Sequence, residues 1–283
     1  MHSKKLVYLI ASIVFIAGAL LSAEAPLGQV SPEACLKCHP SKNKKYKKKQ
    51  ATVASFTKHK HATLETGCES CHGDGAKHSA MKPKALTKLR DKKKDTFIVV
   101  NKKSELCAEC HAKGGKDTIT LASDLMVNPQ QQYAEMKYNL HTKFKVTCRM
   151  CHDPHAPLKS KAGIRRKCLD CHKGKFAVPI EIAAMAGLSC EQCHMPKAVK
   201  NKSESKVGKY TKGDMVSHIF GITDDPNYKL NDGSGKVGLD KDGLARLTVE
   251  QTCYACHQSG AASEMGREVL LSRMSDIHPK KEH

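Results

Sequence analysis

"CRMCHDPHAP", residues Cys148–Pro157, places two cysteines and two histidines within ten residues. Its first half is a Cys-x-x-Cys-His string that ends at His152, and a second histidine, His155, follows three residues later. Cys-x-x-Cys-His is the attachment motif of c-type haem: both thiols bond to the porphyrin, and the histidine ligates the iron. A histidine just outside such a string is therefore a candidate ligand for an iron.

The same string occurs seven times and uses all 14 cysteines of the chain. The strings occupy residues 35–39, 68–72, 107–111, 148–152, 168–172, 190–194 and 253–257. The candidate attachment residues are Cys35, Cys38, Cys68, Cys71, Cys107, Cys110, Cys148, Cys151, Cys168, Cys171, Cys190, Cys193, Cys253 and Cys256. The candidate proximal ligands are His39, His72, His111, His152, His172, His194 and His257. The pattern predicts seven covalently bound haem c groups, each with one iron.

Other uses of cysteine fit the pattern less well. An exported protein with an even number of cysteines is often a disulfide scaffold. Zinc ribbons and thioredoxin-like dithiols also contain Cys-x-x-Cys. None of these requires a histidine directly after every pair, which is what the sequence has.

The composition predicts an unusual fold class. The chain has 283 residues but no tryptophan, and aromatic residues make up 5% of it, so few large side chains are available for a core. We expect a mainly irregular chain with short α-helices and almost no β-sheet, wrapped round a chain of closely packed haems. The sequence favours helices over 129–141, 178–188 and 262–278, and one short strand at Phe97–Val100. The three strings between Cys148 and His194 should form a tight cluster.

The first residues have the features of an export signal. Lys4 and Lys5 precede the apolar stretch Leu6–Leu21, and small residues follow to Ala23. Residues 1–23 are therefore predicted to be a signal peptide, with an uncleaved anchor as the alternative. Residues 24–283 are expected to form a single domain in the periplasm, with membrane association only if the N-terminal segment is retained.

The sixth position of each iron separates carriers from catalysts, because a filled position leaves no place for a substrate. Outside the strings and the two ends of the chain, the candidate distal ligands are His59, His61, His78, His141, His155, His218 and His278. Their number permits two histidines on every iron. His155 is too close to His152 in sequence to reach the far face of the same haem. We expect it to ligate another iron, within the cluster from Cys148 to His194.

The formal net charge of +20 does not by itself indicate a nucleic-acid partner. Haem propionates would offset part of this charge, and no aromatic residues interleave the lysine-rich runs at 41–50 and 86–95 to stack on bases. The lysines are interpreted as propionate partners and solvated faces. The alternative is a docking face for an acidic redox partner near the first haem.

Two stretches resemble known multihaem cytochromes c. "SFTKHKHATLETGCESCHGDGAKH" (55–78) and "NLHTKFKVTCRMCHDPH" (139–155) are similar to the decahaem electron-conduit cytochromes that sit within outer-membrane porins. The resemblance implies that the distal ligands include His61 or His59, His78, His141 and His155. "GDMVSHIFGI" (213–222), followed by "LTVEQTCYACH" (247–257), resembles a C-terminal module of membrane-associated multihaem cytochromes and implies that His218 is a ligand. The chain departs from the decahaem family in having seven strings.

The resemblance and the histidine count together favour an electron carrier that is not an enzyme. Its low-potential bis-histidine haems would serve anaerobic respiration or extracellular electron transfer. Its redox partners would be a quinol-side donor and a terminal reductase or outer-membrane conduit. One alternative is a multihaem reductase of nitrite, hydroxylamine or a sulfur oxyanion, with one open haem. Others are the haem subunit of a membrane quinol-oxidising complex, or an extracellular filament.

Overall fold

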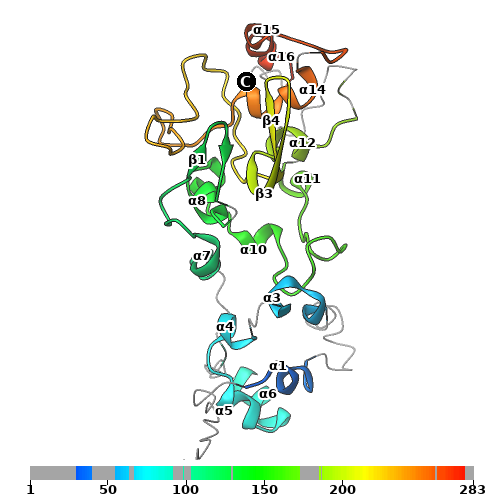
Figure 1. Ribbon diagram of the computed structural model, residues 1–283. Helices are drawn as coiled ribbons and strands as arrows, with labels where there is room; N and C mark the ends of the chain where they lie inside the picture. The colour runs from blue at the N-terminus through cyan, green and yellow to red at the C-terminus, as the bar shows by residue number, and fades with distance from the viewer. Residues whose placement is uncertain are drawn as a thin grey trace, which may run out of the picture.

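The computed structural model describes residues 30–39, 55–63, 67–91, 98, 103–128, 130–172, 185, 187–258 and 260–277. The helices of the early part of the chain lie at one end of the molecule (Figure 1). The longer strands and the C-terminal helices lie at the other end. The described part of the chain therefore runs from one end of the molecule to the other.

Short helices account for most of the regular structure. In the first half of the chain they are α1 (Pro32–Leu36), η2 (Phe56–Lys58), α3 (Lys60–Thr63), α4 (Glu69–His72), α5 (Ala76–Ala80), α6 (Pro83–Asp91), α7 (Glu105–His111), α8 (Gln132–Lys137) and α9 (Leu140–Lys143). They continue with α10 (Cys148–Cys151), α11 (Cys168–Cys171), α12 (Cys190–His194), α13 (Val249–Thr252), α14 (Tyr254–His257), α15 (Arg267–Ser272) and α16 (Met274–Ile277). The predicted class, short helices joined by irregular chain, is confirmed.

Each Cys-x-x-Cys-His string forms about one helical turn. In the first string the N–H of His39 donates to the carbonyl oxygen of Cys35 at 2.9 Å, and the corresponding bond recurs at 2.9 Å in the strings that begin at Cys68, Cys148, Cys168 and Cys253. Residues three and four apart lie on the same side of a helix, so one turn presents both thiols and the histidine together. The motif therefore produces the local structure that its chemistry requires.

A four-stranded sheet was not predicted. It is formed by β1 (Leu121–Ala122), β2 (Leu125–Met126), β3 (Val199–Val207) and β4 (Tyr210–Met215), in that spatial order. β3 and β4 form an antiparallel hairpin with a register shift between Val199 and Glu204, and β2 pairs parallel with β3 at Met126 and Val199. The sheet is small, and its hairpin escaped prediction because the lysine-rich sequence there lacks the apolar alternation by which strands are recognised.

One small core supports the later part of the chain. Its members are Ile119, Leu121, Met126, Ala134, Ala198, Val199, Ile219, Val237, Ala245 and Leu247. They come from the sheet, from α8 and from the loops around residues 219–247. Gly213 belongs to the same packing, because a side chain there would clash with the carbonyl oxygen of Val199.

The early part of the chain has no comparable core. Before Ala108, Gly75 is the one buried residue among those whose burial is described. Helices this short are not stable in water unless they pack against something. Contacts beyond their own hydrogen bonds are therefore needed to hold α1, α4 and α5 in place.

Two predicted helices are split in the structure. The helix predicted over 129–141 appears as α8 and α9, because the extended backbone of Asn139 interrupts it and caps α9 through the N–H of His141. The helix predicted over 262–278 appears as α15 and α16. Most of the helix predicted over 178–188, most of the strand predicted at Phe97–Val100 and the signal segment 1–23 lie outside the described residues, with Ile98 in a bend.

The core can be tested at Leu247, which is 0% exposed. Leu247→Ala should lower the free energy of unfolding by about 2–5 kcal/mol, because it removes buried methyl groups and leaves a cavity. Chemical unfolding followed by circular dichroism measures the change. Leu239→Ala is the matched control, since Leu239 is 47% exposed. Equal losses for the two variants would contradict this description of the core.

Candidate functional site

Five of the string histidines face a second histidine from elsewhere in the chain. The ring centroids are 5.9–6.3 Å apart in all five pairs. The pairs are His39–His78 at 6.3 Å, His72–His155 at 5.9 Å, His111–His61 at 6.1 Å, His152–His218 at 6.2 Å and His172–His141 at 5.9 Å. Each pair joins a predicted proximal ligand to a predicted distal one.

This separation fits two imidazoles that share one iron. Metal–imidazole bonds are about 2 Å long and a ring centroid lies roughly 1 Å behind its nitrogen, so two such rings lie roughly 6 Å apart. The histidines of these pairs are thus arranged to hold a metal between them, which is the fit expected of haem iron.

Burial keeps several of these histidines in the form that binds metal. Withdrawal from water lowers the pKa values of His39, His61, His141, His152 and His155 below the ordinary value. It lowers the pKa of His218 to about 4. Neutral imidazole, with a lone pair on one nitrogen, is the ligand form.

The structure distinguishes His61 from His59. The ring of His61 faces His111, whereas the Nδ1 atom of His59 accepts the backbone N–H of His61 at 3.0 Å. The His59 ring also lies parallel to Phe56, with centroids 6.3 Å apart. His59 therefore fixes the turn that carries His61, and the described contacts place His61 as the candidate ligand.

His155 lies in a different place from the one predicted. Its ring is parallel to that of His72, at an angle of 2°, so it pairs with the second string and not with the cluster from Cys148 to His194. The prediction was wrong because it used distance along the sequence, whereas the "DPH" turn directs His155 toward the earlier strings. Asp153 makes this turn by accepting the N–H of His155, and it forms an ion pair with Arg165 at 2.9 Å.

The segment Ser217–Phe220 links three strings. His218 faces His152 of the fourth string, and the ring of Phe220 meets the ring of His141 edge-on at 4.6 Å. The carbonyl oxygen of Phe220 accepts the Nδ1–H of His194 at 2.7 Å. One short segment thus contacts a candidate ligand at each of the fourth, fifth and sixth strings.

Asn139 holds two of the candidate distal ligands. Its side-chain oxygen accepts the N–H of His141 at 2.8 Å, and its amide nitrogen donates to the carbonyl oxygen of His218 at 2.8 Å. The residue is 2% exposed. Sequence analysis missed this role, although an asparagine directly before a helix is a recognisable capping signal. Nothing in the sequence marked its second partner, which is 79 residues away.

The last two strings orient their histidines through carbonyl groups. His194 donates from Nδ1 to Phe220, and His257 donates from Nδ1 to the carbonyl oxygen of Ser263 at 2.6 Å. A carbonyl can only accept, so Nδ1 carries the hydrogen and Nε2 keeps the lone pair that ligation needs. His278, the remaining distal candidate, lies outside the described residues.

Contacts between cysteines place the strings in a row. Cys35 lies close to Cys68, and Cys107 lies close to Cys148. Burial raises the pKa values of the Cys71, Cys151 and Cys193 thiols, and thiols of the next string, Cys110, Cys171 and Cys253, raise them further. Cys168 is likewise close to Cys190.

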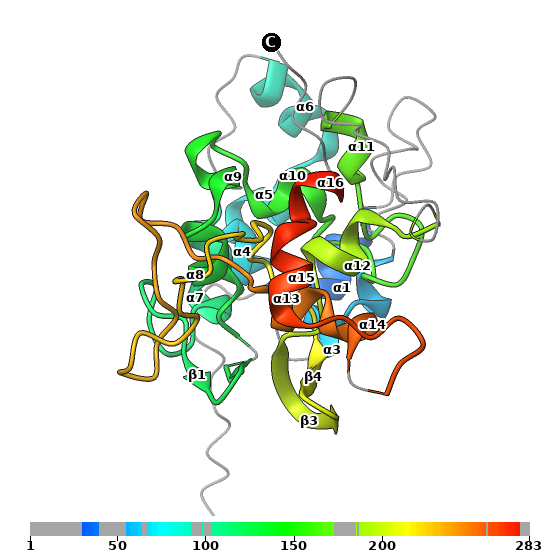
Figure 2. The same ribbon diagram turned by 90° about the horizontal axis from the view of Figure 1, so that it is seen from above.

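The order along the row is the order along the sequence. Figure 1 shows α1, α4, α7, α10, α11, α12 and α14, which carry the strings, in succession from one end to the other. The cysteine contacts join each string to its neighbour in that order. Seen along the long direction, α1, α12 and α14 lie near α13 and α15 in projection, as expected for a stacked arrangement (Figure 2).

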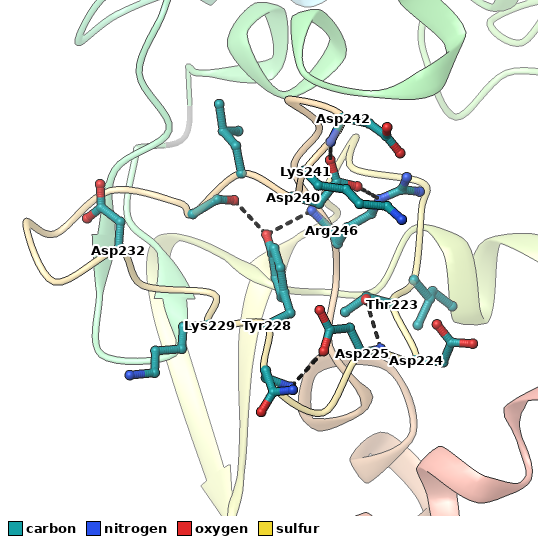
Figure 3. Close-up of a pocket in the computed structure, with 14 residues that line it drawn as sticks. Thr223, Asp224, Asp225, Tyr228, Lys229, Asp232, Asp240, Lys241, Asp242 and Arg246 are labelled. Carbon is teal, nitrogen blue, oxygen red and sulfur yellow. Dashed lines mark hydrogen bonds and ion pairs between the residues drawn. The ribbon is translucent and has the colours of Figure 1, made fainter.

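One surface pocket contains no residue of a string. It is formed by the loop between Ile222 and Arg246, and Tyr228 projects into its centre (Figure 3). Although partial burial opposes it, the N–H of Leu244 and the guanidinium of Arg246 hold the pKa of Asp240 below its usual value. The Tyr228 hydroxyl donates to Gly238 and accepts the N–H of Arg246. Tyr228, Asp240 and Arg246 are bonded within the loop, and these bonds stabilise it.

Two family models match the chain. That for the doubled CXXCH motif matches residues 61–116, and that for cytochrome c554 and c-prime matches residues 22–73. Together with the repeated strings and the paired histidines, these matches identify the chain as a multihaem c-type cytochrome, which binds haem c through its Cys-x-x-Cys-His strings.

A particular relative is the C-type polyheme cytochrome OmcB of Geobacter sulfurreducens. It is 26% identical over 182 residues, and the match covers 62% of this chain but 21% of OmcB. Among solved structures, the octaheme sulfite reductase MccA of Wolinella succinogenes has a TM-score of 0.41 and 16% identity, covering 77% of this chain and 38% of MccA. The outer cell wall cytochrome OcwA has a TM-score of 0.42 and 18% identity, covering 74% and 57%. These scores are too low to carry an argument about activity.

Among the residues that the structure describes, no helix has the length and apolar character needed to cross a membrane.

The assignment of His61 can be tested against its neighbour. His61→Ala should convert one low-spin haem to a high-spin one, because it removes the imidazole that faces His111. His59→Ala should leave the number of low-spin haems unchanged. Electron paramagnetic resonance of the two haem-loaded variants measures this difference. Loss of a low-spin signal in His59→Ala alone would reverse the assignment.

Proposed function

We propose that the chain carries seven haem c groups and transfers electrons, and that it is not a reductase. Haem held by two histidines supplies an iron that exchanges single electrons and offers no open position to a substrate. The observation that carries the proposal is the set of five histidine pairs with ring centroids 5.9–6.3 Å apart. For these five strings, the chain itself supplies both candidate axial ligands.

The row of strings supports a carrier more than a catalyst. A carrier needs redox centres that lie close to one another from one end to the other, and cysteines of neighbouring strings lie close to one another here. A reductase needs a cavity at one iron, lined by groups that bind and protonate a substrate. A described pocket in the Ile222–Arg246 loop contains no residue of a string, and its Tyr228, Asp240 and Arg246 side chains are bonded within the loop.

The compartment in which the protein would act follows from where haem c is attached. Haem c is attached outside the cytoplasm, so the protein would be exported, to the periplasm or beyond it, in anaerobic respiration or extracellular electron transfer. Its partners would be redox proteins that give and take electrons at the two ends of the row. The exposed lysines of the β3–β4 hairpin, which include Lys202, Lys206 and Lys209, suit an acidic partner near the last string.

The test is a haem count together with a spin-state measurement on the purified protein. The pyridine haemochrome assay should give seven haems per chain, and electron paramagnetic resonance should show low-spin iron. Added nitrite, hydroxylamine or sulfite should leave the low-spin signals of the five paired haems unchanged, because the proposed ligands occupy both of their axial positions. A high-spin signal that shifts with one of these compounds would contradict the carrier function and favour a reductase.

A further inference from the structure

Glu135 is a buried carboxylate beside a candidate iron ligand. It lies in α8, and its side chain is 1% exposed. It accepts the backbone N–H of His218 and, at 3.2 Å, the hydroxyl of Ser217. Both of these donors are neutral groups. Burial raises the pKa of Glu135 to about 7, although these hydrogen bonds oppose the rise.

The Nδ1 atom of His218 is also buried, and it has no hydrogen-bond partner. If Nε2 of His218 is bound to iron, Nδ1 must carry the hydrogen and becomes a buried donor. Buried donors almost always find an acceptor, and ligand histidines almost always donate from the other ring nitrogen. Oε2 of Glu135 lies 3.9 Å from Nδ1, so a shift of the carboxylate by less than one bond length would make it that acceptor.

At three other ligand candidates, the acceptor near this atom is neutral or has its charge balanced. Nδ1 of His194 and of His257 donate to backbone carbonyls. Asp153 lies 3.4 Å from Nδ1 of His155, but its charge is balanced by the ion pair with Arg165. Glu135 differs from these acceptors in being a buried carboxylate with no such cation beside it.

We propose that Glu135 is a positioning residue that accepts the Nδ1–H of iron-bound His218 and thereby lowers the reduction potential of the fourth-string haem. The proposal rests on the ligation of that haem by His152 and His218, which belongs to the proposed function. A negative charge close to the imidazole stabilises the oxidised iron, and the dry surroundings strengthen the effect. The fourth string lies in the middle of the row, so its potential would affect every electron that crosses the protein.

Glu135→Gln tests the proposal because it keeps the size of the side chain and an acceptor oxygen but removes the charge. In a spectroscopic redox titration of the haem-loaded protein, one haem should shift to a more positive potential. The expected change is tenfold or more in its redox equilibrium constant, which is 59 mV for one electron. The g values of one low-spin signal should change with it.

Glu204→Gln is the matched control. Glu204 is in the exposed β3–β4 hairpin, where its side chain is 47% exposed and pairs with Lys200. The variant removes the same charge, but water screens that site, so the titration should be unchanged. A Glu135→Gln curve that overlays the wild-type curve would overturn the proposal. An equal shift in Glu204→Gln would also overturn it, because the effect would then reflect net charge alone.

A second variant keeps the test decisive if Glu135→Gln does not incorporate its haems. Glu135→Asp retains the charge but withdraws it from His218, and it should shift the same haem positively by less than tenfold. No shift in that variant would overturn the proposal. Failure of the proposed function is a separate result: the wild-type protein would then lack low-spin, doubly ligated haems, whatever the variants do.

Discussion

Two imidazoles can share one iron only if their rings face each other across roughly 6 Å, and the rest of this structure depends on that spacing. One ring of each pair is placed by the helical turn of its own string. The other ring comes from a distant segment, so each pair fixes a long-range contact: His155 connects the fourth string to the second, and His61 connects the second to the third. The pairs thus link the first five strings to distant segments with little side-chain core.

The core of buried side chains lies beside the segments that carry candidate ligands of the later strings. The core around Met126, Ile219 and Leu247 lies next to α8 and the Ser217–Phe220 segment. There Asn139 and Glu135 hold the backbone of His218 from two sides. Polar side chains are buried at this point because they satisfy the backbone groups of a segment that is neither helix nor strand. Among the described residues, the early strings have no comparable core of buried side chains.

Much of the site could be predicted from the sequence, since the chemistry of haem attachment is local. Five residues specify a string, and the one-turn helix follows from the same five. The histidine pairs required the fold: the number of spare histidines indicated that distal ligands exist, but not that His155 pairs with His72. The β3–β4 hairpin was missed because its exposed lysines carry no apolar period. Glu135 was missed because a glutamate on a short amphipathic segment normally faces water, and its burial depends on Ser217, 82 residues away.

The positions of the irons test this account most directly. An anomalous difference map, recorded at the iron absorption edge from crystals of the haem-loaded protein, would locate each iron without reference to the chain. The account predicts a peak between the rings of His72 and His155, one between each of the other four pairs, and peaks that follow one another in the order of the strings. A peak that joins His155 to a histidine of the fifth or sixth string would contradict it.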